Sequence, residues 1–110
     1  RFALYGSRYT CLAAGKMNEE NDFDCSLVGH CCESGDILQE NVSLPATKKG
    51  DLLAVLTTGA YNYSMASNYN RIPRPALVAV SEGRSKIVIK RETYDDIIKK
   101  DIYYGLAKII

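Results

Sequence analysis

The apolar residues of this 110-residue chain fall in short runs that are separated by polar stretches rich in Gly, Pro and other turn-forming residues. The clearest runs are residues 51–57 (DLLAVLT), 76–81 (ALVAVS) and 86–90 (KIVIK). Short apolar runs bounded by turn signals are typical of strands. The pattern therefore predicts a mainly β domain, a β-barrel or β-sandwich, with short helices near one end.

The first half of the chain divides into strands, turns and polar loops. Residues 9–14 and 25–30 have the composition of strands, and the acidic stretch 15–24 between them is expected to be a solvated loop. Residues 31–36 (CCESGD) carry the turn signal Ser-Gly-Asp. We interpret residues 39–50 as a polar loop that closes with Lys-Lys-Gly.

The middle of the chain predicts one buried strand followed by helical turns. Residues 51–57 are apolar almost throughout, so we expect a buried strand, continued in an extended path by residues 59–61. Residues 64–70 (SMASNYN) are expected to make one or two helical turns with Ser64 as the N-cap. The two prolines that follow would end any helix there.

The last third predicts a hairpin and then a helix. Residues 76–81 and 86–90 flank Glu-Gly-Arg-Ser, and this spacing indicates a β-hairpin. Residues 93–100 (TYDDIIKK) begin with a Thr cap, carry acids in the first turn and end in lysines, which matches the helix dipole. The tail 101–110 is apolar on several sides, and we expect it to pack against something absent from this chain.

Charge and composition exclude several classes of partner. With 14 basic and 13 acidic residues the net charge is +1, so the chain lacks the broad basic face that nucleic acids require. No apolar run approaches the roughly 20 residues of a membrane span, and no signal peptide is visible. The four cysteines, two of them adjacent, are expected to be cytosolic thiols, which predicts a cytoplasmic protein.

Several motifs are more specific than the composition. Residues 1–5 (RFALY), 32–36 (CESGD) and 59–70 (GAYNYSMASNYN), the last followed by PRPA at 73–76, resemble segments of diaminopimelate decarboxylases. These enzymes depend on pyridoxal 5′-phosphate (PLP) and are alanine-racemase-like. RETY at 91–94 is a weaker fourth match. Together these segments span nearly the whole chain, and segment 59–70 is specific because so long a fixed string rarely arises by chance.

The resemblance implies that this chain is one domain of a larger enzyme. Residues 1–110 would form the C-terminal β domain of a two-domain enzyme, and the chain, which opens on Arg1 rather than Met, is expected to be a piece of a longer polypeptide. The Schiff-base lysine, the phosphate loop and the ring-stacking histidine of this family belong to the N-terminal TIM barrel, which is absent. The isolated piece is therefore expected to be inactive.

The resemblance assigns the proton donor to Cys32. In such enzymes the PLP ring withdraws the electrons left at Cα when CO2 departs. A proton must then reach Cα from a defined face. A thiol suits this step because its unperturbed pKa of roughly 8.5 keeps it mostly protonated at neutral pH. Without the resemblance, a small buried apolar residue would be the favoured interpretation of Cys32, and the matching context of Glu33 and Tyr61 reverses that preference.

The resemblance also assigns substrate and cofactor contacts. Glu33 would accept hydrogen bonds from the distal ammonium of meso-2,6-diaminopimelate, and the Tyr61 hydroxyl would bind the PLP phosphate close to the substrate. Arg1 and Tyr5 would clamp the distal carboxylate, because the planar guanidinium of Arg binds a carboxylate through two bonds. Phe2 departs from the proline that the family usually has. Without the resemblance, Glu33 could be a solvated surface residue. Tyr61 could be a structural tyrosine whose ring is packed and whose hydroxyl contacts water.

The same resemblance predicts a homodimer with shared active sites. Cys32, Glu33 and Tyr61 would reach across the two-fold interface, whereas Arg1 and Tyr5 would serve the barrel of their own chain. The product would be L-lysine, the end of lysine biosynthesis.

Other functions remain open at this point. One is a decarboxylase of ornithine, arginine or carboxynorspermidine, although Glu33 argues against it because the ornithine enzymes have a shorter acid after the cysteine. A second is a non-catalytic regulatory homologue, which would be expected to lose Cys32 or Tyr61. A third is a structural β domain with coincidental motifs. A zinc site at His30 with its neighbouring thiols is disfavoured because the ligands are not paired and spaced.

Overall fold

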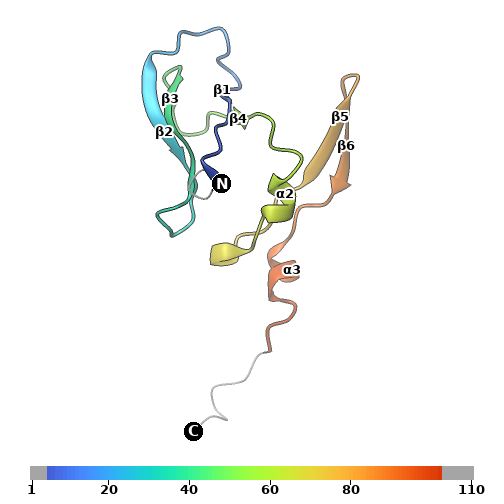
Figure 1. Cartoon of the computed structure of the whole chain (residues 1–110). Coiled ribbons are helices and arrows are strands. Elements are labelled where there is room, and N and C mark those ends of the chain that lie inside the picture. Colours follow the sequence, from blue (N-terminus) through green and yellow to red (C-terminus); the bar gives the residue numbers. More distant parts are fainter. Residues whose placement is uncertain (1–4, 103–110) are drawn as a thin grey trace. The chain divides into compact units, whose positions relative to one another are not determined.

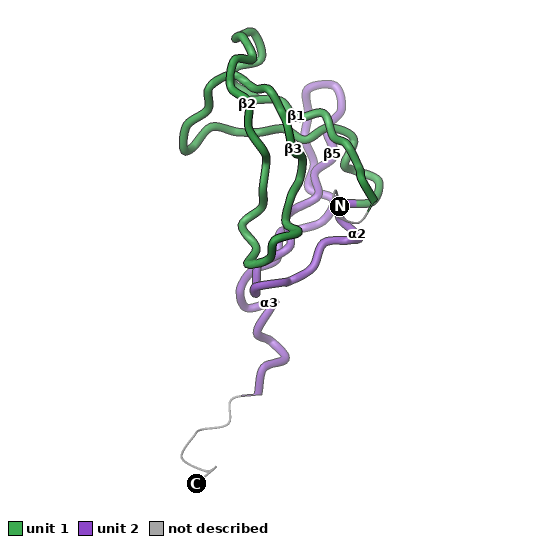
Figure 2. The backbone as a smooth tube through the Cα atoms, turned by 60° about the vertical axis from the view of Figure 1, so that its left-hand side comes forward, with its two compact units in different colours: residues 1–61 green, residues 62–110 purple. Residues whose placement is uncertain are grey.

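The computed structural model describes residues 5–102 and divides into two compact units, residues 1–61 and 62–110 (Figure 2). The described residues form the strands β1 to β6, which pair as three two-stranded antiparallel sheets, together with short helical turns (Figure 1). The prediction of a mainly β chain with short helices is confirmed. The strand pairings of the described residues do not close a barrel.

Unit 1 contains two strand pairs. β1 (Cys11–Ala13) pairs with β4 (Leu53–Val55), and β2 (Phe23–Val28) pairs with β3 (Ile37–Leu44). The pair β2–β3 is a hairpin whose connecting loop is residues 29–36 (Figure 1). The strands expected at 9–14 and 25–30 and the turn expected at 31–36 are therefore confirmed, with the strand ends shifted.

The core of unit 1 is small. Among its described residues, Cys11 and Ala13 of β1, Leu44 of β3 and the adjacent Pro45 are buried, and Leu44 is only 2% exposed. Gln39 is buried beside them, and its amide is satisfied. The Gln39 Oε1 atom accepts the Tyr9 N–H at 2.9 Å, and its Nε2 donates to the Glu40 carbonyl at 3.1 Å. Gln39 thus connects β3 to the segment that leads into β1.

The polar loop expected at residues 39–50 is wrong in its first half. Strand β3 runs on to Leu44, and over its last four residues Asn41 and Ser43 are exposed, Val42 is half-buried and Leu44 is buried. This alternation has the period of a strand that is buried on one face. A bulge interrupts the pairing opposite Ser26, where Asn41 takes a φ of 54°, a conformation that Asn tolerates better than most residues. Pairing with β2 outweighs the low strand preference of Gln, Glu and Asn.

The buried strand expected at residues 51–57 is also partly wrong. β4 covers only three of these residues, and it pairs with β1 alone. Leu52 is 74% exposed, and Leu53 and Leu56 are exposed as well. An apolar run predicts burial only where a second layer covers it, and the described residues of this unit do not supply one.

Unit 2 begins with short helical turns. Residues 59–61 form the turn that leads into α2 (Asn62–Met65), so the extended path expected there is wrong. Ser64 lies inside α2 and is not its N-cap. A second turn, η1 (Tyr69–Arg71), follows after a gap, and the expectation of one or two helical turns near residues 64–70 is confirmed.

The hairpin and the helix predicted for the last third are both present. β5 (Leu77–Ser81) and β6 (Arg84–Ile89) are joined by Glu82 and Gly83, which both have positive φ values, 50° and 72°. This is the twist that a two-residue hairpin turn needs. α3 (Tyr94–Ile98) starts at the Thr93 cap and ends one residue before the first lysine, so the lysines follow the helix instead of lying in its last turn. Tail residues 103–110 lie outside the described residues.

Unit 2 relies on polar contacts more than on a core. None of its described residues is fully buried. The Thr93 side chain accepts the Asp96 N–H at 3.2 Å, and the Asp96 carboxylate accepts the Thr93 N–H at 2.8 Å. This reciprocal pair is a capping box, which satisfies backbone donors that a helix start leaves open.

Among residues 5–102, no helix has both the length and the apolar character needed to cross a membrane.

Candidate functional site

The loop between β2 and β3 presents Cys32 and Glu33 side by side. Both residues are exposed, and both lie in the bend of loop 29–36. All four cysteines of the chain are thiols. The loop therefore offers a thiol and a carboxylate to whatever approaches this end of the hairpin.

Backbone hydrogen bonds fold this loop locally. The Glu33 N–H donates to the Cys31 carbonyl at 2.8 Å, and the Asp36 N–H donates to the Glu33 carbonyl at 3.3 Å. At the base of the loop the Gly29 N–H donates to the Asp36 carbonyl at 2.7 Å. These bonds close two tight bends within eight residues, as the Ser-Gly-Asp signal predicts.

The Asp36 carboxylate occupies the inside of the loop. Its Oδ2 atom accepts the Cys31 N–H at 2.8 Å. A Cβ atom placed on Gly29 would lie 2.0 Å from this same Oδ2 and 2.3 Å from Cγ. Real Cβ atoms do not approach so closely, so the loop needs glycine at position 29 in order to hold the carboxylate where it is.

The other predicted site residues lie on separate segments. Tyr61 stands in the turn before α2 and is 74% exposed, and Tyr5 is 71% exposed. Arg1 lies outside the described residues. The structure therefore brings Cys32 and Glu33 together on one loop, while Tyr61 and Tyr5 come from elsewhere in unit 1.

All four cysteines and the single histidine lie among the residues that the structure describes. Within the described part of the chain, no group of three or more His, Cys, Asp or Glu side chains is arranged to hold a metal ion. Cys11 is a core residue: burial raises the pKa of its thiol, and the nearby Cys25 adds to the effect. A raised pKa keeps a thiol protonated and unreactive.

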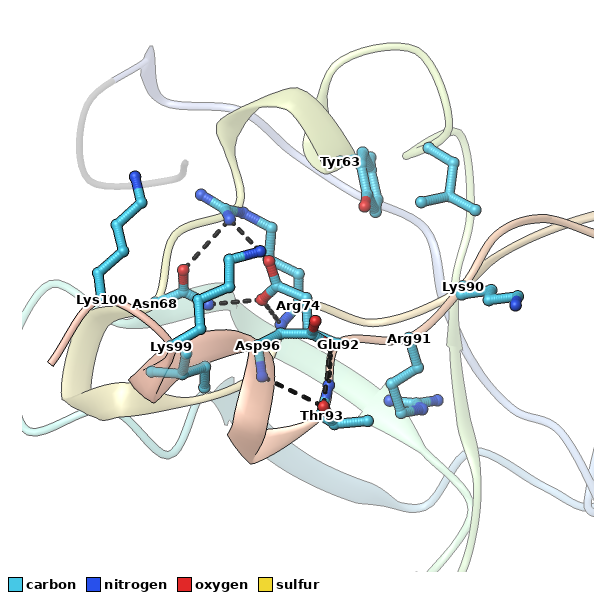
Figure 3. Close-up of a pocket in the computed structure, with 12 residues that line it drawn as sticks. Tyr63, Asn68, Arg74, Lys90, Arg91, Glu92, Thr93, Asp96, Lys99 and Lys100 are labelled. Carbon is cyan, nitrogen blue, oxygen red and sulfur yellow. Dashed lines mark hydrogen bonds and ion pairs between the residues drawn. The ribbon is translucent and has the colours of Figure 1, made fainter.

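Unit 2 has a groove of its own (Figure 3). Arg74 and Asn68 converge on Glu92 within it: Arg74 Nη1 lies 3.0 Å from Glu92 Oε1, and Asn68 Nδ2 lies 2.6 Å from Glu92 Oε2. Lys90 and Lys99 are among the basic residues that line the groove. Because the polar groups bind one another, we assign the cluster of Asn68, Arg74 and Glu92 a structural role.

The charge of Glu92 is stabilised by these partners. Hydrogen bonds from the Arg74 N–H and from the Asn68 amide, with the Arg74 guanidinium, lower the pKa of the Glu92 carboxyl below its ordinary value. Asn68 of segment 59–70 and Glu92 of segment 91–94 are therefore joined by a hydrogen bond that stabilises unit 2.

Sequence reasoning missed Gly29 and Asp36 as parts of the site. A signal was available, because Ser-Gly-Asp marks the turn and an Asp in a turn commonly accepts backbone N–H groups. The close fit of the Asp36 carboxylate against the Cα of Gly29 has no such signature. It is visible only in the folded loop.

Comparisons with known proteins place this site in context. The family model for the pyridoxal-dependent decarboxylase C-terminal sheet domain matches residues 1–59. The diaminopimelate decarboxylase of Bacillus subtilis is 56% identical over 102 residues, which are 93% of this chain and 23% of that protein. The Synechocystis enzyme of the same name is 48% identical over 97 residues, 88% of this chain and 21% of that protein.

A solved structure agrees with the sequence relatives. The crystal structure of diaminopimelate decarboxylase from M. jannaschii in complex with L-lysine is 34% identical, with a TM-score of 0.80, over 94% of this chain and 24% of that chain. The chain therefore spans less than a quarter of the length of the curated relatives that it matches.

Proposed function

This chain belongs to the pyridoxal-dependent decarboxylases, as part of their C-terminal sheet domain, and on that premise we propose that the full-length protein converts meso-2,6-diaminopimelate to L-lysine and CO2. The names of its relatives and of its structural neighbour support this substrate. The observation that carries the proposal is the exposed Cys32–Glu33 pair on loop 29–36. Residues 1–110 would be the C-terminal domain of a two-domain enzyme.

Cys32 is the proton donor in this proposal. PLP, when bound, supplies an electron sink for the charge left at Cα by the departing CO2. The Cys32 thiol then delivers a proton to that carbon. Its place in the bend of an exposed loop fits this task, because a donor must come within hydrogen-bond distance of the atom it protonates.

Glu33 recognises the far end of the substrate. Its exposed carboxylate accepts hydrogen bonds from the distal ammonium, and its position next to Cys32 couples recognition to proton delivery. A charge-assisted hydrogen bond of this kind is stronger than a neutral one. An acid one methylene shorter would reach a differently placed ammonium.

The proposed active site includes three further residues of this chain, Tyr61, Tyr5 and Arg1. The phenol of Tyr61 is exposed and can donate a hydrogen bond to a phosphate oxygen of PLP. This hydrogen bond is the contact that we assign between the described residues and the cofactor. Arg1, together with the exposed Tyr5, clamps the distal carboxylate. The remaining cofactor contacts are assigned to the part of the protein outside this chain.

We propose that the protein works as a cytoplasmic homodimer. Cys32, Glu33 and Tyr61 are all exposed in unit 1, so each is accessible to a second subunit. In this arrangement they complete the partner's active site, while Arg1 and Tyr5 serve their own subunit. The closed two-fold symmetry gives two equivalent sites.

Activity of the full-length protein tests the proposal. Cys32→Ala should leave PLP bound, as seen in its absorbance, while kcat for diaminopimelate falls at least about 100-fold, the usual contribution of a positioned acid. Cys25→Ala removes a thiol from β2 of the same hairpin and should keep kcat within about 3-fold of wild type. An unchanged kcat in Cys32→Ala would remove Cys32 from the donor role. Absence of lysine production by the wild-type protein would refute the assigned activity.

A further inference from the structure

Loop 29–36 must hold two exposed side chains in fixed positions without a core around them. We propose that Asp36 is the residue that positions Cys32 and Glu33, and that Gly29 is its obligatory neighbour. The inference rests on the proposed role of Cys32 and adds to it a residue that touches neither substrate nor cofactor.

The hydrogen bonds of Asp36 support this role. Its carboxylate accepts the Cys31 N–H at 2.8 Å, its own N–H donates to the Glu33 carbonyl at 3.3 Å, and its carbonyl accepts the Gly29 N–H at 2.7 Å. The first two bonds reach the residues on either side of Cys32. Asp36 therefore fixes the backbone before and after the proposed donor.

Gly29 makes this arrangement possible. An ideal Cβ on Gly29 would meet the Asp36 Oδ2, Cγ and Oδ1 atoms at 2.0, 2.3 and 2.3 Å. Any side chain at position 29 must push the carboxylate away from the Cys31 N–H. The backbone of Gly29 does not need a left-handed conformation, since its φ is not positive, so the requirement for glycine is one of space.

The rest of the hairpin does not depend on Asp36. The β2–β3 ladder runs from Phe23 paired with Leu44 to Val28 paired with Ile37, and Leu44 anchors its far end in the core. Loss of the carboxylate should therefore loosen the loop and leave the strands paired. A loosened donor loses rate, because misplacement by about 1 Å can cost about 100-fold.

Four variants of the full-length PLP-bound protein test the inference through kcat for diaminopimelate. Asp36→Ala and Gly29→Ala should each lower kcat about 10- to 100-fold. Asp36→Asn keeps an oxygen acceptor for the Cys31 N–H and should recover most of the loss, to within about 5-fold of wild type. Asp51→Ala is the matched control. It removes another carboxylate of unit 1 that accepts a backbone N–H, from Lys48 at 2.9 Å, and should leave kcat within about 3-fold.

Double variants separate positioning from general damage. If Asp36 acts through Cys32, Asp36→Ala should cost no more than about 3-fold in a Cys32→Ala background, because residues that act as a unit are not additive. Gly29→Ala can be tested in the same Cys32→Ala background, and it replaces Asp36→Ala in this experiment if Asp36→Ala does not fold. A full 10- to 100-fold loss in the Cys32→Ala background would overturn the role of Asp36 in positioning Cys32.

The outcomes distinguish the two proposals. If Cys32→Ala lowers kcat but Asp36→Ala and Gly29→Ala do not, the proposed function stands and the positioning role is wrong. If Cys32→Ala itself leaves kcat unchanged, the donor assignment and the positioning role both fall. Equal losses in Asp36→Asn and Asp36→Ala would also overturn the inference, since the acceptor atom would then be irrelevant.

Discussion

Arg74 and Glu92 are joined through both their backbones and their side chains. The Glu92 N–H donates to the Arg74 carbonyl at 3.1 Å, the Arg74 N–H donates to Glu92 Oε2 at 2.8 Å, and Arg74 Nη1 donates to Glu92 Oε1 at 3.0 Å. In a unit without fully buried residues among those described, this double connection fixes the segment before β5 against the segment after β6.

The stability of this connection should depend on pH through Glu92. The pKa of its carboxyl is lower in the folded protein than in the unfolded chain. The stabilisation is therefore complete above the unfolded pKa, near 4.3 for a typical Glu, and is lost as the pH falls through the folded value. Amide hydrogen exchange at residues 74 and 92 of the full-length protein should accelerate in this acidic range beyond the intrinsic pH effect. Glu92→Gln should remove that dependence, whereas the same change at exposed Glu20 should not.

Glu33→Asp should alter substrate choice. The shorter acid withdraws its carboxylate from the distal ammonium of diaminopimelate, so kcat/KM for this substrate should fall about 10-fold or more. The fall for ornithine, a shorter diamino acid, should be smaller. Steady-state assays on both substrates measure the ratio, with Glu40→Asp on β3 as the control. Equal losses on both substrates would detach Glu33 from recognition of the distal group.

Tyr61→Phe should weaken PLP binding. A hydrogen bond to a charged group contributes about 1.5–3 kcal/mol, so the dissociation constant of PLP should rise about 10- to 100-fold. Titration of the cofactor-free full-length protein with PLP measures the change. Tyr94 has nearly the same exposure, 72% against 74%, and Tyr94→Phe should leave the constant unchanged. A similar rise in both variants would argue against a specific phosphate contact.

Leu44→Ala should destabilise the hairpin that carries Cys32. Leu44 is 2% exposed, and removing such a side chain usually costs about 2–5 kcal/mol. Urea unfolding of the full-length protein, followed by hydrogen exchange in β2 and β3, should show the loss. Met17→Ala, at a position 68% exposed, should change stability by no more than about 0.5 kcal/mol. A neutral Leu44→Ala would mean that the core of unit 1 lies elsewhere.

Local signals made parts of the fold predictable. The Glu82-Gly83 turn and the Thr93 cap each act within a few residues of themselves, so the β5–β6 hairpin and α3 could be predicted from sequence. Strand β3 could not, because Gln39 and Ser43 become strand residues through pairing with β2, and Gln39 also through the hydrogen bond that its side-chain amide accepts from Tyr9. Those contacts bridge residues that are distant in the sequence, and propensity does not register them.

The candidate site also has a part that the sequence predicts and a part that only the folded structure reveals. Cys32 and Glu33 were identified through motif resemblance, and their shared turn follows from Ser-Gly-Asp. The contact between Gly29 and Asp36 depends on where a carboxylate packs, and no pattern of residue types encodes that distance. The convergence of Tyr61 with the Cys32–Glu33 pair stays a prediction.

The space above the Cα of Gly29 also has an evolutionary consequence. Because the Asp36 carboxylate fills that space, positions 29 and 36 cannot mutate independently. A lineage that acquires alanine at position 29 while aspartate is still at position 36 passes through a strained loop. If the residue at 36 becomes smaller first, the same alanine meets no such clash. That first change, however, also removes the acceptor of the Cys31 N–H, so either order passes through an impaired loop and the Gly29–Asp36 pair resists replacement as a unit.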